Sequence, residues 1–94
     1  MSYTKMNPSE AHGTSFHDVE ILMPFDKIVE KLGKPHVTYE PGDKVRYEWC
    51  FQDIDGRPVT VYDWKTYSDR PNEWHVGGWD KWDTVDFKKW FDGL

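Results

Sequence analysis

Two short segments carry the side chains best suited to binding chemistry, namely residues 62–65 and residues 73–79. Tryptophan and tyrosine offer large, rigid surfaces with a polar atom, while a lysine and a histidine add polar contacts. The pair Gly77-Gly78 would let a partner approach the backbone closely. The candidate binding residues are therefore Tyr62, Trp64, Lys65, His75 and Trp79.

The same segments also have a purely structural interpretation. Gly77 and Gly78 are typical of a bulge or of the end of a strand whose core residues would be Trp74 and Val76. The aromatic residues of 62–64 would then form a small cluster under a loop, or a contact between two copies of the chain. The sequence leaves both interpretations open.

A metal site or a cysteine-based site is not expected. The four histidines, His12, His17, His36 and His75, lack the short spacings that place two ligands on one element. Cys50 is the only cysteine and lies in a segment that reads as a strand, where a thiol usually behaves as a small apolar side chain. We therefore predict no metal and no cofactor.

Catalytic motifs are equally sparse. The chain contains no phosphate-binding glycine loop and no nucleophile-elbow pattern. Asp63, Glu73 and His75 could meet between neighbouring strands as acid–base groups, but most acidic domains offer such a trio. No catalytic residue is assigned, and whether the chain is an enzyme stays open, with a non-enzymatic role favoured.

Composition narrows the class of protein. The chain has 94 residues, which is the length of a single domain. Its net charge of −5 disfavours binding to long nucleic acids. No apolar run approaches the roughly 20 residues that span a bilayer, and residues 1–13 have no apolar signal-peptide core. We expect a cytoplasmic protein without a membrane partner.

Six tryptophans are too many for so small a core to hide completely, so some should be exposed.

The elements that must position these residues follow a β-α-β-β-β-α order. Phe25, Ile28, Val29 and Leu32 form an apolar helical stripe that ends at Gly33. The predicted elements are a flexible leader over 1–13, strands over 14–22, 45–52, 58–64 and 73–79, and helices over 25–32 and 84–92, the second capped by Asp83 or Thr84.

This order predicts one α+β domain over residues 14–94. Its sheet would be small, four-stranded and mainly antiparallel, with both helices on one face. Alternation places Trp49, Phe51 and Val61 toward the helices, and Tyr62 and Trp64 on the opposite face. The predicted core residues are Phe25, Ile28, Trp49, Phe51, Val61 and Phe91.

Four pieces of the chain, read together, resemble a group of small, uncharacterised bacteriophage accessory proteins. They are Glu48-Trp49-Cys50-Phe51, the turn Asp55-Gly56, the strand from Val59 to Lys65, and Trp74-His75-Val76-Gly77-Gly78. The resemblance covers residues 14–79 and assigns no catalytic residue. It implies a phage protein acting in the cytoplasm of an infected bacterium.

Three functions are compatible with these observations. The favoured one is a non-enzymatic, phage-encoded inhibitor that binds a host defence component, expected to be a protein, through an aromatic-rich surface. The first alternative is a small nucleotide-binding or nucleotide-sequestering protein that uses Trp stacking with His75 and Lys65. A virion or assembly component is the second alternative, and a homodimer is compatible with each.

Overall fold

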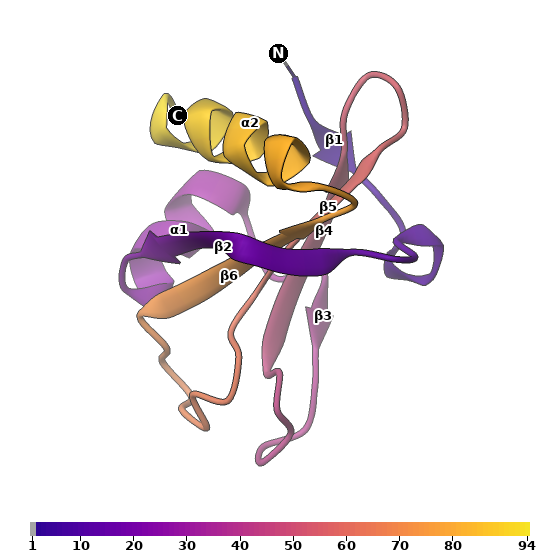
Figure 1. Ribbon diagram of the computed structural model, residues 1–94. Helices are drawn as coiled ribbons and strands as arrows, with labels where there is room; N and C mark the ends of the chain where they lie inside the picture. Colours follow the sequence, from indigo (N-terminus) through magenta and orange to yellow (C-terminus); the bar gives the residue numbers. More distant parts are fainter. Residues whose placement is uncertain (1) are drawn as a thin grey trace.

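The computed structural model describes residues 2–94, which form a mixed sheet-and-helix fold with short connections (Figure 1). In chain order, the elements are β1 (Thr4–Lys5), the 3₁₀ helix η1 (Pro8–Glu10), β2 (Ser15–Leu22), α1 (Phe25–Leu32), β3 (Val37–Thr38), β4 (Tyr47–Gln52), β5 (Pro58–Tyr62), β6 (Glu73–Gly78) and α2 (Lys81–Asp92).

Within residues 2–94 the sheet has six strands, and not the four expected from the sequence. Its order is β1-β4-β5-β6-β2, with β3 also paired to β4, and every pairing is antiparallel. Strands β1 and β3 are the two that the sequence pattern does not predict. Each has two residues, which is too short for an alternation of apolar and polar side chains to be visible.

These two short strands share the outer edge of β4. Strand β1 pairs with its C-terminal end, and β3 pairs with its N-terminal end. The backbone N–H of Met6 donates to the Cys50 carbonyl, and the Cys50 N–H donates to Nδ1 of His36 at 2.9 Å. Burial lowers the pKa of His36, which favours the neutral ring that this bond requires. The edge of β4 is thus closed to further strand pairing.

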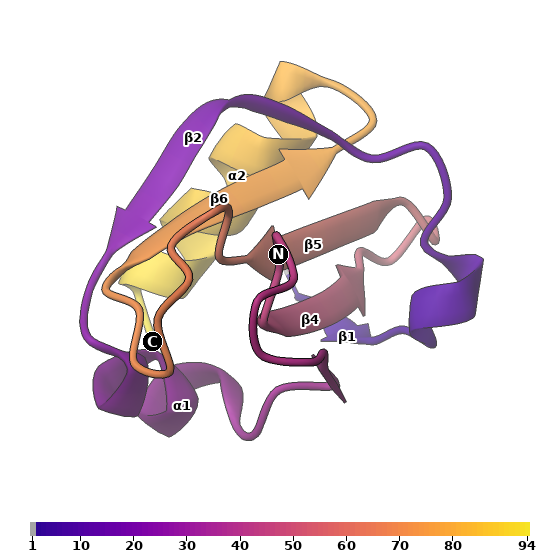
Figure 2. The same cartoon turned by 90° about the horizontal axis from the view of Figure 1, so that it is seen from below.

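Both helices contribute to one core on one face of the sheet. Ile28 of α1 and Phe87 and Phe91 of α2 belong to the same buried cluster as the inward side chains of the strands. Figure 2, seen from below, shows α2 running behind β6 toward β2, while α1 lies at one end of the sheet. Of the six predicted core residues, all but Phe25 are buried, and Phe25 packs half-buried against the cluster.

Two tryptophans anchor this core. Trp49 and Trp74 are fully buried, with ring centroids 5.4 Å apart in an edge-to-face arrangement. Each indole N–H has a backbone acceptor: the Gly33 carbonyl for Trp49 and the Met23 carbonyl for Trp74. A buried indole N–H without a partner would be costly, so these bonds tie both ends of α1 to the sheet.

The predicted boundaries of α1 and the predicted end of α2 at residue 92 are confirmed, whereas the predicted start of α2 is wrong. Helix α1 begins after Pro24 and ends at Gly33, whose φ of 83° favours glycine. Helix α2 begins at Lys81, three residues earlier than predicted, because Asp80 is the N-cap. Its carboxylate accepts from the Asp83 N–H at 2.9 Å.

Within residues 2–13, where a flexible leader was predicted, the structure places β1 and η1. Tyr3 makes ring contacts with Phe87 and Trp90, both at 5.0 Å between centroids. Met6 is only 9 % exposed. These residues cover the end of the core beside α2, and Met1 lies outside the described residues. The flexibility of the segment stays a prediction of the sequence.

Deleting residues 2–12 should therefore lower the free energy of unfolding by about 2–4 kcal/mol, because the side chains of Tyr3 and Met6 leave their apolar surroundings. For a chain of this size the melting midpoint should fall by about 10 °C or more. Thermal unfolding followed by circular dichroism measures it. An unchanged midpoint would show that the segment is a dispensable leader, as its sequence alone suggests.

Candidate functional site

A line of aromatic rings crosses the sheet on the face opposite the core. Phe16 of β2 stacks on His75 of β6 with centroids 3.9 Å apart and an interplanar angle of 14°. His75 meets Tyr62 of β5 at 5.6 Å, and Tyr62 meets Trp64 at 6.5 Å, both edge to face. Lys65 Nζ lies 5.5 Å from the centroid of the Trp64 ring. We call these five residues the aromatic row.

The structure thus brings together four of the five candidate residues and adds Phe16, which the sequence did not indicate. Strand β2 reaches this position through a register shift. Glu20 pairs with His75, so an unbroken register would pair Phe16 with Trp79, whereas Phe16 pairs with Gly77. Asp18, with φ of 64°, lies in the irregular stretch. The shift moves Phe16 along β6 to the His75 ring.

The fifth candidate, Trp79, lies apart from the row. It follows β6, four residues beyond His75, and is 48 % exposed. Its indole N–H donates to the His12 carbonyl at 2.8 Å, and the Arg57 guanidinium lies 4.9 Å from its ring centroid. Arg57 is in turn paired with Asp83 at 2.8 Å. Trp79 therefore joins the N-terminal segment to the start of α2.

Packing, and not ligand approach, explains the two glycines beside Trp79. A Cβ at Gly77 would meet Thr60 Oγ1 at 2.6 Å, and one at Gly78 would meet Thr84 Cγ2 at 3.0 Å. Both glycines are paired within the sheet, and the bulge expected here lies on the neighbouring strand β2. The structural interpretation of residues 74–78 is confirmed for Trp74 and Val76, which are fully buried.

The loop after β5 presents the exposed end of the row, and one buried carboxylate organises it. Asp63 is 1 % exposed. Its Oδ1 accepts from the backbone N–H groups of Arg46 and Tyr47 at 2.9 and 2.8 Å, and its Oδ2 accepts from Thr66 Oγ1 at 2.9 Å. Charged acceptors form strong hydrogen bonds. Asp63 therefore fixes the loop to the start of β4.

This loop holds two residues in a backbone conformation that side chains rarely adopt. Lys65 has φ of 54° and Tyr67 has φ of 51°. The Lys65 N–H donates to the Lys44 carbonyl at 2.7 Å, which joins the loop to the β3–β4 connection. Figures 1 and 2 both show these two connections side by side at one end of the sheet. Such strain persists only where the surroundings enforce it, and it is common at functional sites.

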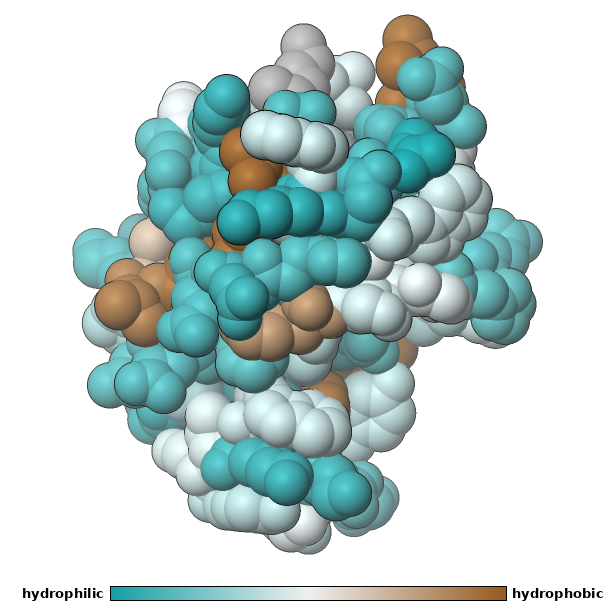
Figure 3. All heavy atoms as spheres, in the orientation of Figure 1, coloured by the Kyte–Doolittle hydropathy of each residue, from teal (hydrophilic) through white to brown (hydrophobic). Residues whose placement is uncertain are grey.

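Trp64 is the most exposed aromatic side chain of the row. Phe16, His75 and Tyr62 are half-buried, whereas Trp64 is 43 % exposed. Burial raises the pKa of Tyr62, so its hydroxyl stays protonated at neutral pH. In the view of Figure 3 the apolar patches are small and separate, surrounded by hydrophilic residues. A binding surface on the face seen in Figure 3 should therefore rely little on aliphatic side chains.

The Cys50 thiol and the Asp63 carboxylate, two side chains that could take part in catalysis, have structural roles. Burial raises the pKa of Cys50 to about 12, so its thiol is not ionised at neutral pH. Asp63 uses both carboxylate oxygens to hold the loop, which leaves the trio with Glu73 and His75 without its acid. The described residues contain no group of three or more side chains arranged to hold a metal ion.

Comparison with known proteins identifies no relative of this chain. No protein-family model, curated protein or solved structure matches the chain. Among residues 2–94, no helix is both long and apolar enough to cross a membrane.

Proposed function

We propose that this chain is a non-enzymatic binding protein that contacts a partner protein through the aromatic row. The observation that carries the proposal is the continuity of the row, which runs over three adjacent strands and ends in an exposed Trp64 on a fixed loop. Binding surfaces concentrate their free energy in a few tryptophan and tyrosine side chains of this kind.

The charges at the exposed end indicate the chemistry of the partner. Lys65 and Lys44 come together through a backbone hydrogen bond, and neither forms an ion pair within residues 2–94. Two unpaired ammonium groups in a chain of net charge −5 favour a partner that brings a carboxylate to this end. The partner would place an apolar or aromatic side chain against Trp64.

The biological role that we propose is inhibition of a host component by a phage-encoded protein in the bacterial cytoplasm. This part rests on the resemblance to phage accessory proteins, several of whose characteristic residues, Tyr62, Trp64, Lys65 and His75, belong to the row. A counter-defence protein needs to occupy a surface of its target and needs no catalytic group, which agrees with the surroundings of Cys50 and Asp63.

Affinity capture from a bacterial lysate tests the proposal when two tryptophan variants are compared. Trp64→Ala should reduce partner affinity by about 2 kcal/mol, roughly thirtyfold, because truncating the exposed tryptophan of the row removes its whole contact with the partner. Trp82→Ala is the matched control, since Trp82 is 71 % exposed but lies on α2. Equal capture by both variants would place the binding surface elsewhere.

Sedimentation of the purified protein separates a host partner from a second copy of the chain. If the row joins two copies, the wild type should sediment as a dimer and the Trp64→Ala variant as a monomer. A monomeric wild type that still loses its lysate partner on Trp64→Ala supports a heterologous complex.

A further inference from the structure

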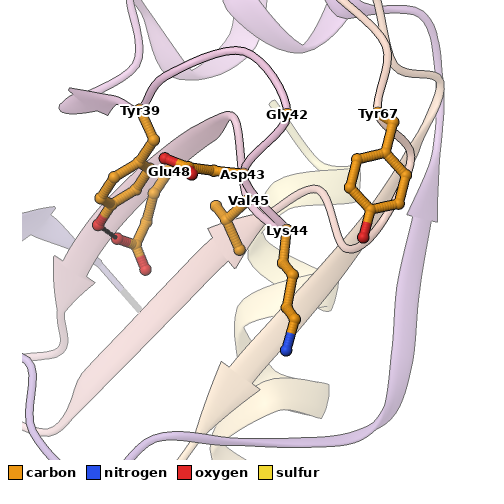
Figure 4. Close-up of a pocket in the computed structure, with 7 residues that line it drawn as sticks. All are labelled: Tyr39, Gly42, Asp43, Lys44, Val45, Glu48 and Tyr67. Atoms are coloured by element: carbon orange, nitrogen blue, oxygen red, sulfur yellow. Dashed lines mark hydrogen bonds between the residues drawn. The ribbon is translucent and has the colours of Figure 1, made fainter.

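A cavity of about 580 Å³ lies between the β3–β4 connection and the loop after β5, next to the aromatic row but not formed by it. Figure 4 shows Tyr39 and Tyr67 at opposite sides of this cavity, with Val45 and Lys44 between them. Its volume falls within the range of roughly 300–1,000 Å³ that is usual for small-molecule sites. We call it the tyrosine pocket.

The two tyrosines offer flat apolar walls. Tyr39 and Tyr67 are 39 % and 61 % exposed, so neither ring is used to fill the core. Tyr67 has the left-handed conformation described above, which is unfavourable for a large side chain and is maintained by the bonds of Asp63 and Lys65. An exposed ring held at such a cost is suited to stacking on a planar ligand.

The charged groups of the pocket are one cation, Lys44, and two carboxylates. Asp43 accepts from the backbone N–H of Glu40 at 3.2 Å, and Glu48 is oriented by Tyr39. Lys44 points its ammonium group away from Tyr39 and has no ion-pair partner within residues 2–94. Glu48 Oε1 accepts from the Tyr39 hydroxyl at 2.7 Å, while its Oε2 makes no hydrogen bond in the described part of the chain. Burial raises the pKa of Tyr39 to about 12, so this hydroxyl remains the donor.

We propose that the tyrosine pocket binds a guanine mononucleotide. The base would stack on a tyrosine, its phosphate would pair with Lys44, and the free oxygen of Glu48 would accept from the base. A carboxylate is an acceptor-only group, so it suits the Watson–Crick edge of guanine, which presents an N1–H and an amino group side by side. Adenine presents one amino group beside an acceptor nitrogen and fits less well.

This site is distinct from the nucleotide hypothesis drawn from the sequence, which relied on tryptophan stacking with His75 and Lys65. The pocket shares Lys44 with the charged end of the proposed protein-binding surface, but no member of the aromatic row, Trp64 included, lines it, so the two proposals are tested by different variants. If GMP does not bind, the prediction that Trp64→Ala loses its lysate partner is unaffected. If Trp64→Ala keeps that partner, the prediction of GMP binding is unaffected.

Isothermal titration of the purified chain with GMP, AMP, guanosine and inorganic phosphate tests the proposal. GMP should bind saturably with a dissociation constant below about 1 mM and at least about tenfold more tightly than AMP. Phosphate alone should bind more weakly than GMP because it forgoes stacking, which is worth about 1–3 kcal/mol per base. Absence of GMP binding at about 1 mM, or equal binding of GMP and AMP, would overturn the assignment.

Three variants locate the site. Lys44→Gln should weaken GMP binding about tenfold and leave guanosine binding unchanged, because only the phosphate contact is lost. Glu48→Gln keeps an oxygen that can accept from Tyr39, but it replaces the other carboxylate oxygen with an amino group that donates. The preference for GMP over AMP should therefore disappear. Lys89→Gln, an exposed lysine on α2 away from the pocket, makes the same charge change and should have no effect. GMP binding that is indifferent to both pocket variants contradicts the proposal.

Discussion

Replacing Phe51 with alanine should lower the free energy of unfolding by about 3–5 kcal/mol, enough to unfold much of a domain of ordinary stability. Phe51 is 7 % exposed on the helix-covered face of β4 and contacts the rings of Phe87, Trp90 and His36 at 5.7, 6.2 and 5.1 Å. Truncation removes these contacts and leaves a cavity between β4 and α2 that neighbouring side chains cannot fill.

Urea denaturation of the Phe51→Ala and Ile54→Ala variants provides the measurement and its control. Ile54 is 90 % exposed in the β4–β5 turn, so its truncation should change stability by less than about 0.5 kcal/mol. If the two variants were equally stable, the side chains of β4 would have to be shifted by one residue, with Phe51 on the open face.

Replacing Asp63 with alanine should lower the free energy of unfolding by about 2–4 kcal/mol, because two backbone N–H groups and the Thr66 hydroxyl lose their shared acceptor. The consequence for binding should be larger than for Trp64→Ala. Without Asp63, the loop no longer holds Lys65 and Tyr67 in their left-handed conformations, so the end of the row and the wall of the tyrosine pocket are lost together.

Asp69→Ala is the appropriate comparison for Asp63→Ala. Its carboxylate is 82 % exposed and pairs with Arg46 at 3.8 Å, a geometry that contributes less than about 1 kcal/mol. Thermal melting should therefore distinguish the two variants clearly, and partner capture should fail only for Asp63→Ala. Retention of both stability and capture by Asp63→Ala would mean that the loop keeps its shape without the buried carboxylate.

Strand alternation predicted the part of the fold that depends on local pattern. It placed Trp49, Phe51 and Val61 in the core and Tyr62 on the opposite face, because a period of two assigns faces without reference to the rest of the chain. The predicted number of four strands was wrong because two of the strands cannot be recognised from local pattern. Strands β1 and β3 exist only because β4 offers them an edge, and two residues carry no pattern of their own.

The candidate site was predictable where its residues are neighbours in one segment, and not where they meet across segments. Tyr62, Trp64 and Lys65 follow one another, so their cluster was visible in the sequence. Phe16 joins them only through the register shift in β2, which depends on pairing with β6. The sequence predicts that Trp79 is a stacking surface because it follows two glycines, yet its contacts are with the N-terminal segment and Arg57.

The tyrosine pocket had no signal in the sequence at all. Tyr39 and Tyr67 are separated by 27 intervening residues and belong to different connections, which meet through the backbone bond from Lys65 to Lys44. Lys65 makes that bond in a conformation with a positive φ. Left-handed lysine and tyrosine are uncommon enough that residue type gives no indication of them.

The central claim, that the aromatic row is a protein-binding surface, is tested most directly by measuring one partner's affinity for three forms of the chain. The partner captured by the wild type should be titrated against wild type, Trp64→Ala and Trp82→Ala after circular dichroism has shown equal melting midpoints. The account predicts about a thirtyfold loss for Trp64→Ala and no change for Trp82→Ala. Equal affinity of Trp64→Ala and wild type would contradict it.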